Sequence, residues 1–142
     1  ISMLIKEFVT QSNKNYMISA ILKHYGVGNV RMKHRSMKDH AHFEVEQGIL
    51  YLSTRYKTLR PSQIKEFLIT IVHETKHAMD AKKFGWRKFA EMWEYEANMI
   101  TQGHRKGKTD PYDDNPHEIE AEAFGQKNWK RWWEKFKKED LF

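Results

Sequence analysis

Hydrophobic residues near the start of the chain recur with the 3.6-residue period of an α-helix. They are Met17, Ile18, Ile21, Leu22 and Tyr25. Gly26 follows directly, and glycine is common after the last helical residue because it accepts a left-handed backbone. The pattern therefore predicts an amphipathic helix that ends just before this glycine.

The pattern then changes to alternation of hydrophobic and polar residues, first over residues 30–33 and again over residues 43–46. A hydrophobic run over residues 49–53 comes directly after Gln47 and Gly48. Alternation and short apolar runs bounded by turn residues are typical of strands. These segments predict a short three-stranded antiparallel sheet with a tight turn at Gln47 and Gly48.

Helical spacing returns after Pro61 and extends to about Lys83, and Gly85 predicts the end of that helix. A further helix is predicted over residues 86–102. Residues 103–115 contain glycines, a proline and aspartates, a composition typical of a loop.

Asn115 and Pro116 predict the start of a last helix, because asparagine is a favoured N-cap and proline a favoured first helical residue. The predicted fold class is therefore α+β. It comprises an N-terminal helix, the small sheet, the long helix and two further C-terminal helices.

Composition narrows the class of protein. The chain has 39% hydrophobic and 31% charged residues, the profile of a globular protein in water. No apolar run is long enough to span a bilayer, so no membrane role is expected, and the absence of cysteine fits a cytoplasmic location. The length suits one domain, residues 1–142, in which Ile1 and Ser2 are expected to be a vector remnant.

The segment His73-Glu74-Thr75-Lys76-His77 has the form HExxH within the long helix. Two histidines four residues apart project from one face and can bind the same metal ion. Glu74 lies about 100° away around the helix, so it misses the metal yet reaches the water that the metal activates. The motif predicts His73 and His77 as ligands of Zn²⁺ and Glu74 as the general base.

The helical wheel places His73 and His77 nearly opposite the apolar face of this helix, beside Glu66 and Asp80. The imidazoles therefore meet either solvent, as ordinary surface histidines, or a cleft covered by the C-terminal half. The apolar face consists of Ile64, Phe67, Leu68, Ile71, Val72, Thr75, Ala78 and Met79.

On the last predicted helix, Glu118 and Glu122 share a face with residues that are expected to pack inward. These are Gly125, Trp129, Trp132, Trp133 and Phe136. Buried carboxylates are costly unless a cation or donors satisfy them. Glu118 is the predicted third metal ligand, and Glu122 is predicted to accept a hydrogen bond from a ligand histidine. Gly125 is expected to allow a close approach to another helix.

Each carboxylate also has an ordinary structural interpretation. Glu118 stands three residues after Asn115, the position of a capping-box glutamate. Glu122 stands one helical turn before Gln126 and could hydrogen-bond to it.

HExxH followed by a helix with Glu-x-x-x-Asp/Glu resembles the gluzincin group of zinc peptidases. The segment from Glu118 to Gly125 is similar to the third-ligand helix of ImmA/IrrE-type peptidases and of the CAAX-prenyl-protease type. In those groups the first Glu ligates zinc and the residue four positions later supports the site, which implies these roles for Glu118 and Glu122. The resemblance also implies a small zincin-like domain, peptide-bond hydrolysis, and a substrate that pairs with the strand at residues 49–53.

The sequence departs from other zincins, and two other third ligands stay open. Asp80 and Lys83 stand where a metzincin has its glycine and its third ligand. Asp110 lies in a segment that resembles the aspzincin loop, and His104 is a candidate by analogy with SprT-like proteases. Glu118 is preferred because it alone combines a helix with a supporting carboxylate.

Peptide hydrolysis also needs a donor that stabilises the oxyanion. The sequence offers His117, Tyr112, His104 and Tyr95, without choosing among them.

A binding module is the alternative class. The net charge of +6, with Trp129, Trp132 and Trp133 among lysines and arginines, would suit a surface that grips nucleic acid or a protein partner beside a structural or degenerate metal site. The tryptophan spacing fits a packed helix face better. Zinc-dependent hydrolysis of a protein or peptide substrate is therefore the preferred prediction.

Overall fold

A computed structural model describes residues 7–28, 30–44 and 47–142. It confirms the α+β class: four helices accompany one three-stranded sheet in the described part of the chain. Among the described residues, no helix combines the length and apolarity that a membrane crossing requires. The elements in chain order are α1 (Gln11–His24), β1 (Arg31–Arg35), β2 (Ala41–Glu44), β3 (Ile49–Ser53), α2 (Ile64–Phe84), α3 (Trp86–Thr101) and α4 (Pro116–Lys138), with short 3-10 turns at Thr54–Tyr56 and Pro61–Gln63.

The sheet is mixed, so the predicted antiparallel sheet is wrong for one of its two pairings. β2 pairs antiparallel with β3, as the turn before Ile49 predicted, but β1 pairs parallel with β3. The strand order β1-β3-β2 makes β3 the central strand. Alternation reports only which face of a strand is buried, and it carries no information about the direction of a neighbouring strand.

The predicted strand bounds also shift by one or two residues. β1 extends to Arg35, and β2 begins at Ala41 and ends at Glu44, whereas the sequence predicted a strand over residues 43–46. Residues 45 and 46 of that prediction lie outside the described residues. Within β2, Ala41 and Phe43 are buried and alternate with more exposed neighbours.

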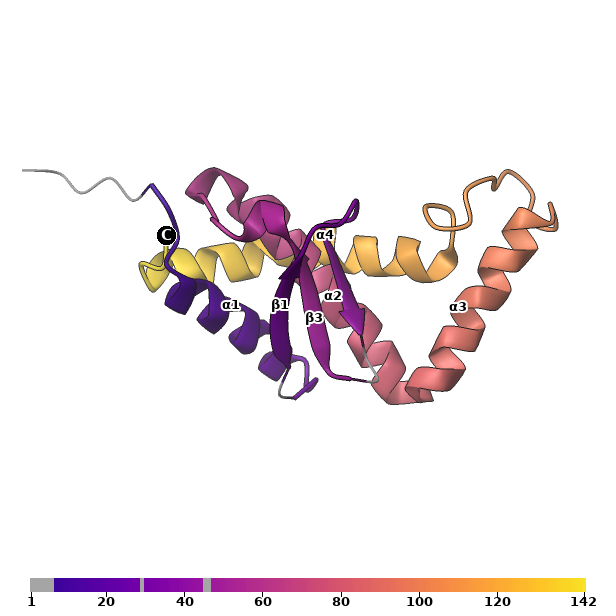
Figure 1. Cartoon of the computed structure of the whole chain (residues 1–142), viewed down its shortest axis with the longest axis horizontal. Helices are drawn as coiled ribbons and strands as arrows, with labels where there is room; N and C mark the ends of the chain where they lie inside the picture. Colours follow the sequence, from indigo (N-terminus) through magenta and orange to yellow (C-terminus); the bar gives the residue numbers. More distant parts are fainter. Residues whose placement is uncertain (1–6, 29, 45–46) are drawn as a thin grey trace, which may run out of the picture.

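The core lies between the sheet, α1, one face of α2 and the C-terminal half of α4. Figure 1 shows the strands in front of α2, with α1 beside β1 and α4 running behind them. Residues with almost no exposed surface fill this layer, as the apolar face of α2 predicted. They include Met17, Ile21, Leu50, Leu52, Phe67, Leu68, Ile71 and Val72.

α4 covers a second side of α2. The histidines therefore face a cleft covered by the C-terminal half of the chain and not open solvent. The close approach expected at Gly125 is present: a Cβ atom there would lie 2.8 Å from the backbone oxygen of Ile69 and 3.6 Å from the backbone nitrogen of His73. Only glycine allows the two helix backbones to come so close at this point. The contact places the first turn of α4 beside the HExxH motif.

A sharp corner at Gly85 separates α2 from α3. Gly85 has a φ of 84°, a backbone conformation that residues with a side chain rarely adopt. Figure 1 shows α3 diverging from the rest of the chain beyond this corner, with the loop that follows it returning to α4. α3 and this loop thereby form one wall beside the HExxH helix.

Candidate metal centre

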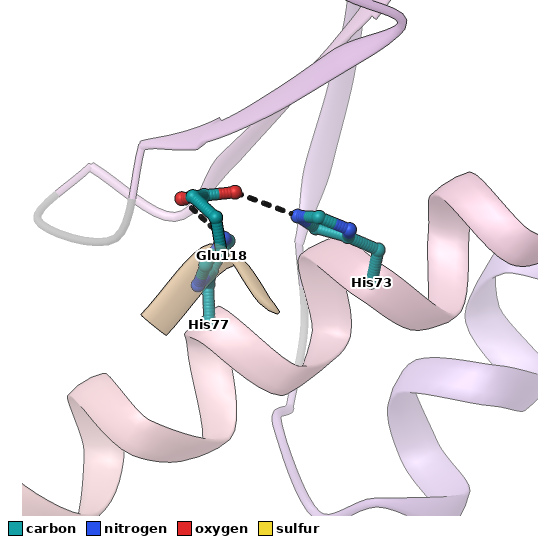
Figure 2. A group of neighbouring side chains, drawn as sticks. All are labelled: His73, His77 and Glu118. Atoms are coloured by element: carbon teal, nitrogen blue, oxygen red, sulfur yellow. Dashed lines mark hydrogen bonds and ion pairs between the residues drawn. The ribbon is translucent and has the colours of Figure 1, made fainter. Parts of the chain in front are cut away.

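His73 and His77 lie one turn apart on α2, and their ring centroids are 5.0 Å apart. Figure 2 shows both rings on the side of α2 that faces Glu118. Their side chains are only 15% and 11% exposed. The HExxH histidines are therefore not ordinary surface residues.

Glu118 lies in the first turn of α4 and reaches both imidazoles. Its Oε1 atom is 2.9 Å from Nε2 of His73, and its Oε2 atom is 2.9 Å from Nε2 of His77. Asn115 is the N-cap, as predicted, and its side-chain oxygen accepts the backbone N–H of His117. The backbone N–H of Asn115 donates to the oxygen of Tyr112. A capping box would require the Glu118 carboxylate to accept this N–H group, so the capping-box interpretation of Glu118 is wrong.

The three residues form a group that could hold a metal ion. One ligand atom from each of His73, His77 and Glu118 lies within 4.8 Å of the other two. Two imidazole nitrogens and a carboxylate oxygen are a donor set that zinc accepts, and such a set leaves one position open.

The unpaired ring nitrogens of His77 support this fit. They are buried, and neither has an aligned hydrogen-bond partner among the described residues, although Nε2 lies 2.9 Å from Oε2 of Glu118. A buried polar atom without a partner is costly. A metal ion would satisfy Nε2, so the residues present fit a bound metal.

The electrostatics keep Glu118 ionised. Burial alone would raise its pKa, but contacts from His73, His77 and Trp93 outweigh burial and hold the pKa well below its usual range. For His73, burial alone would lower the pKa. The adjacent carboxylates of Glu118 and Glu74 outweigh burial, so the pKa of His73 is raised. Glu118 therefore offers a charged carboxylate over the whole physiological pH range.

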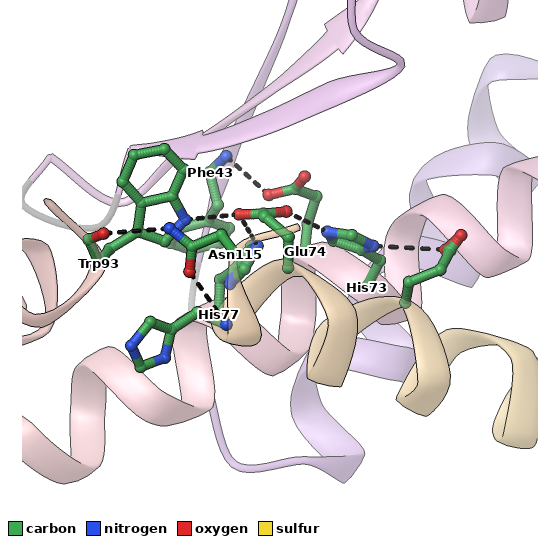
Figure 3. Close-up of polar contacts among 9 residues, drawn as sticks. Phe43, His73, Glu74, His77, Trp93 and Asn115 are labelled. Carbon is green, nitrogen blue, oxygen red and sulfur yellow. Dashed lines mark hydrogen bonds and ion pairs between the residues drawn. The ribbon is translucent and has the colours of Figure 1, made fainter. Parts of the chain in front are cut away.

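Glu74 stands beside this group without joining it. Its Oε2 atom accepts the backbone N–H of Phe43 in β2 at 3.1 Å, as Figure 3 shows. The side chain is almost fully buried, and burial raises its pKa to about 7, the histidines opposing the shift. A carboxylate with a pKa near neutrality can both accept and return a proton.

Glu122 meets one expectation and departs from another. Its Oε1 atom lies 3.4 Å from Nδ1 of His73, the ring nitrogen that does not face Glu118. Its side chain is 51% exposed, so the predicted burial of Glu122 is wrong. No hydrogen bond to Gln126 is present within the described ranges. The carboxylate occupies the position from which a ligand histidine can be oriented.

Sequence reasoning missed Trp93 and the role of Asn115 beside it. The indole Nε1–H of Trp93 donates to Oε2 of Glu118 at 2.8 Å. The side-chain amide of Asn115, which is fully buried, donates to the backbone oxygen of Trp93 at 3.1 Å (Figure 3). The sequence predicted only that Trp93 lies within a helix over residues 86–102, and no sequence signal identified the polar partner of its indole.

The alternative third ligands lie away from the histidines. Asp110 is exposed, and its Oδ1 atom accepts the backbone N–H groups of Tyr112 and Asp113 in its own loop. His104 is exposed just beyond the end of α3. Within the described residues neither belongs to a group that could hold a metal ion.

One of the four predicted oxyanion donors lines the cleft at the metal group. Tyr112 lies there with Glu74 and Glu118, and 38% of the residue is exposed. Partial burial, reinforced by these carboxylates, raises the pKa of its hydroxyl. The other three do not line it: the ring of His117 packs against Phe89 with the ring centroids 5.5 Å apart, His104 is exposed, and Tyr95 is 57% exposed.

Two pockets flank the metal group. The larger, of about 470 Å³, is here called the polar pocket, and its lining includes His40, Glu66, Thr70, Glu122 and Gln126. The other, of about 360 Å³, is here called the aromatic pocket, and its lining includes Phe43, Trp86, Phe89, Ala90 and Trp93. Glu74 and Tyr112 line both, so the metal group lies where the pockets meet.

Comparison of the chain with protein-family models, curated proteins and solved structures found no match. The resemblance to gluzincins therefore rests on the residues of this chain alone.

Proposed function

We propose that the chain is a zinc-dependent peptidase of the gluzincin type. The observation that carries the proposal is the position of Glu118, whose carboxylate reaches both HExxH imidazoles from a different helix. A helix surface with two chance histidines does not require such a partner. Together with the buried Glu74, the three residues supply what metal-assisted hydrolysis requires.

His73, His77 and Glu118 would hold the ion, and Glu122 would fix the orientation of the His73 ring through Nδ1. A zinc ion held there would supply Lewis acidity. Glu74 would accept a proton from the attacking water at its carboxylate and deliver it to the leaving amine. The hydrogen bond from Phe43 keeps Oε2 of Glu74 fixed, which leaves Oε1 for the proton.

Tyr112 is the proposed donor to the oxyanion that forms during attack. Its raised pKa keeps the hydroxyl protonated, so the O–H group remains a donor at every pH at which the protein would work.

An extended substrate would pair with β2. The expectation that residues 49–53 form the edge of the cleft is wrong, because β3 is the central strand and both of its sides are paired. β2 pairs only with β3 in the described sheet, and residues of β2 line the aromatic pocket. Apart from the N–H of Phe43, which donates to Glu74, the outer side of β2 could add one strand from a peptide.

The nucleic-acid alternative has less support than the metal centre. Trp132 is buried, and Trp129 and Trp133 are partly buried against the core, so the tryptophans favour packing over base stacking. The net charge of +6 remains its support. The lysines and arginines of α4 remain exposed, as a solvated helix face requires.

Elemental analysis of protein purified without chelator tests the proposal. We expect near-stoichiometric zinc in the parent and in Asp110→Ala and His104→Ala, and loss of zinc in Glu118→Ala. Glu74→Gln should keep the metal and lose hydrolysis of unstructured polypeptides by several orders of magnitude. A parent chain that cannot be loaded with zinc would refute the proposal.

A further inference from the structure

Charge is segregated between the cleft and the rest of the chain. The whole sequence has 25 lysines and arginines against 19 aspartates and glutamates. Five carboxylates line the aromatic pocket and four line the polar pocket, with Asp39 and Glu74 common to both. Lys38 is the only lysine or arginine lining either pocket in the described structure. An acidic cleft in a basic protein is the opposite of what composition alone would produce.

Several of these carboxylates already have partners. Glu74, Glu118 and Glu122 belong to the metal centre, and Glu66 lies 3.4 Å from the guanidinium of Arg55. Three remain: Asp39, Glu44 and Glu94, here called the carboxylate rim. All three line the aromatic pocket, and Asp39 and Glu94 are exposed.

Glu44 is the most sheltered member of the rim, with a side chain 39% exposed. Nε2 of His42 lies 3.9 Å from its Oε2 atom, and the His42 side chain is 54% exposed. Among the described residues, no lysine or arginine forms an ion pair with a member of the rim, although Lys38 precedes Asp39 and lines the polar pocket with it.

The interior of the same pocket is apolar. Phe43 and Phe89 are 7% and 8% exposed, and the side chains of Trp86 and Trp93 complete the wall. The volume of about 360 Å³ suffices for one large side chain. His77 and Glu118 also line this pocket, so whatever fills it lies next to the metal centre.

We infer that the substrate is a cationic polypeptide: a bulky apolar side chain enters the aromatic pocket beside the bond to be cleaved, and neighbouring lysine or arginine side chains face the carboxylate rim. The inference rests on the proposed function and specifies its substrate class. An apolar interior gives affinity for the side chain, while the rim attracts cations and repels acidic peptides and phosphates.

Binding of three labelled peptides of equal length tests the inference. The first has a central phenylalanine flanked by lysines, the second has that phenylalanine flanked by glutamates, and the third has a central glycine flanked by lysines. Fluorescence anisotropy would be measured on zinc-loaded Glu74→Gln protein, which should not cleave the peptides. The measurement would be repeated in the presence of chelator. We expect the first peptide to bind about tenfold or more tighter than the second at low salt, a ratio that salt reduces. The third should bind about tenfold more weakly than the first.

Two variants assign these preferences to the pocket. Neutralising the rim (Asp39→Asn, Glu44→Gln and Glu94→Gln together) should remove most of the preference for lysine over glutamate. Ala90→Trp should fill the pocket and weaken the phenylalanine peptides while leaving the glycine peptide unchanged. Matched controls are the neutralisation of three exposed carboxylates away from the cleft (Glu91, Glu120 and Glu134) and Ala123→Trp on the exposed side of α4.

Equal binding of the lysine and glutamate peptides, equal effects of the rim and control variants, or no binding of any peptide would each overturn the inference. Failure of the proposed function would give a different result. Either the protein would not retain zinc, or the parent protein, with Glu74 in place, would not cleave the cationic peptide although that peptide binds selectively.

Discussion

At the scale of single residues, the candidate metal centre depends on how the Glu118 carboxylate is shared between its partners. Oε1 faces His73, whereas Oε2 faces His77 and also accepts the indole N–H of Trp93. Asn115 in turn holds the backbone of Trp93. The carboxylate therefore has one preferred orientation, set from α3 as well as from its own helix.

Trp93→Phe removes this indole donor and keeps most of the aromatic surface. We expect zinc affinity to fall about tenfold or more, because groups that orient a ligand contribute roughly this much. Competition with a chromophoric chelator measures the affinity. Trp86→Phe, on the same helix and without a hydrogen bond to Glu118 in the described structure, should leave it unchanged. Equal affinities for the parent and Trp93→Phe would assign Trp93 to packing alone.

The sequence predicted the residues of the metal group better than their surroundings. His73, Glu74 and His77 follow from the period of one helix, and Glu118 from the cost of a carboxylate among aromatics. Trp93 could not be predicted, because the partner of an indole N–H is fixed by how α3 and α4 meet. The exposure of Glu122 was missed for the same reason.

At the scale of elements, the described helices were predictable from their periodicity and caps, and the pairing of β1 was not. One of the contacts that join α1 to the sheet region involves Lys14, which no sequence pattern singled out. Lys14 is 1% exposed, and its ammonium group lies 3.0 Å from both Nε2 of His34 in β1 and the backbone oxygen of Tyr56. Burial lowers the pKa of Lys14 to about 8, from an ordinary value of 10.5.

This shift predicts how the free energy of unfolding varies with pH. Between pH 8 and 10.5 the unfolded chain binds more protons at Lys14 than the folded chain, so this residue makes stability rise with pH across that window. The gain should be on the order of 1–3 kcal/mol relative to Lys14→Met. Urea unfolding of both proteins at several pH values measures it. Parallel pH profiles for the two proteins would contradict the prediction.

The crossing of α2 and α4 gives a second prediction at this scale. Gly125→Ala would place a methyl group 2.8 Å from the backbone oxygen of Ile69, so the helices must separate. We expect a loss of about 1–3 kcal/mol in the free energy of unfolding, as for other overpacked cores, together with weaker zinc binding. Lys127→Ala, exposed on the same helix, is the control. Unchanged zinc affinity in Gly125→Ala would show that Glu118 does not depend on the close crossing.

At the scale of the whole molecule, the proposed metal would join two helices that are far apart in sequence. Because the ligands come from α2 and α4, the ion would bind the folded chain and not the unfolded one. The acidic cleft also belongs to this scale. Its carboxylates come from the segment around β2 and from three helices, and no local sequence pattern could have revealed that they converge.

Zinc should therefore raise the thermal stability of the parent. At a free zinc concentration a thousandfold above Kd, the expected stabilisation is about 4 kcal/mol, which corresponds to a rise in Tm on the order of 10 °C. Differential scanning calorimetry with zinc and with chelator measures it. Glu118→Ala should show little of this rise, and an identical Tm for the parent under both conditions would argue against a metal that joins α2 and α4.

The corner at Gly85 divides the chain into parts that could change independently. The proposed ligands lie before it on α2 and at the start of α4, whereas α3 and the loop after it supply most of the aromatic wall of the cleft. α3 and the loop after it connect the C-terminal end of α2, the HExxH helix, to the N-terminal end of α4, which carries Glu118. Trp93 and the proposed oxyanion donor Tyr112 belong to this segment and would have to be kept. A grafted segment that kept these two residues but differed in length or in its other side chains would change which substrates the site accepts, while the proposed ligands on α2 and α4 stayed in place.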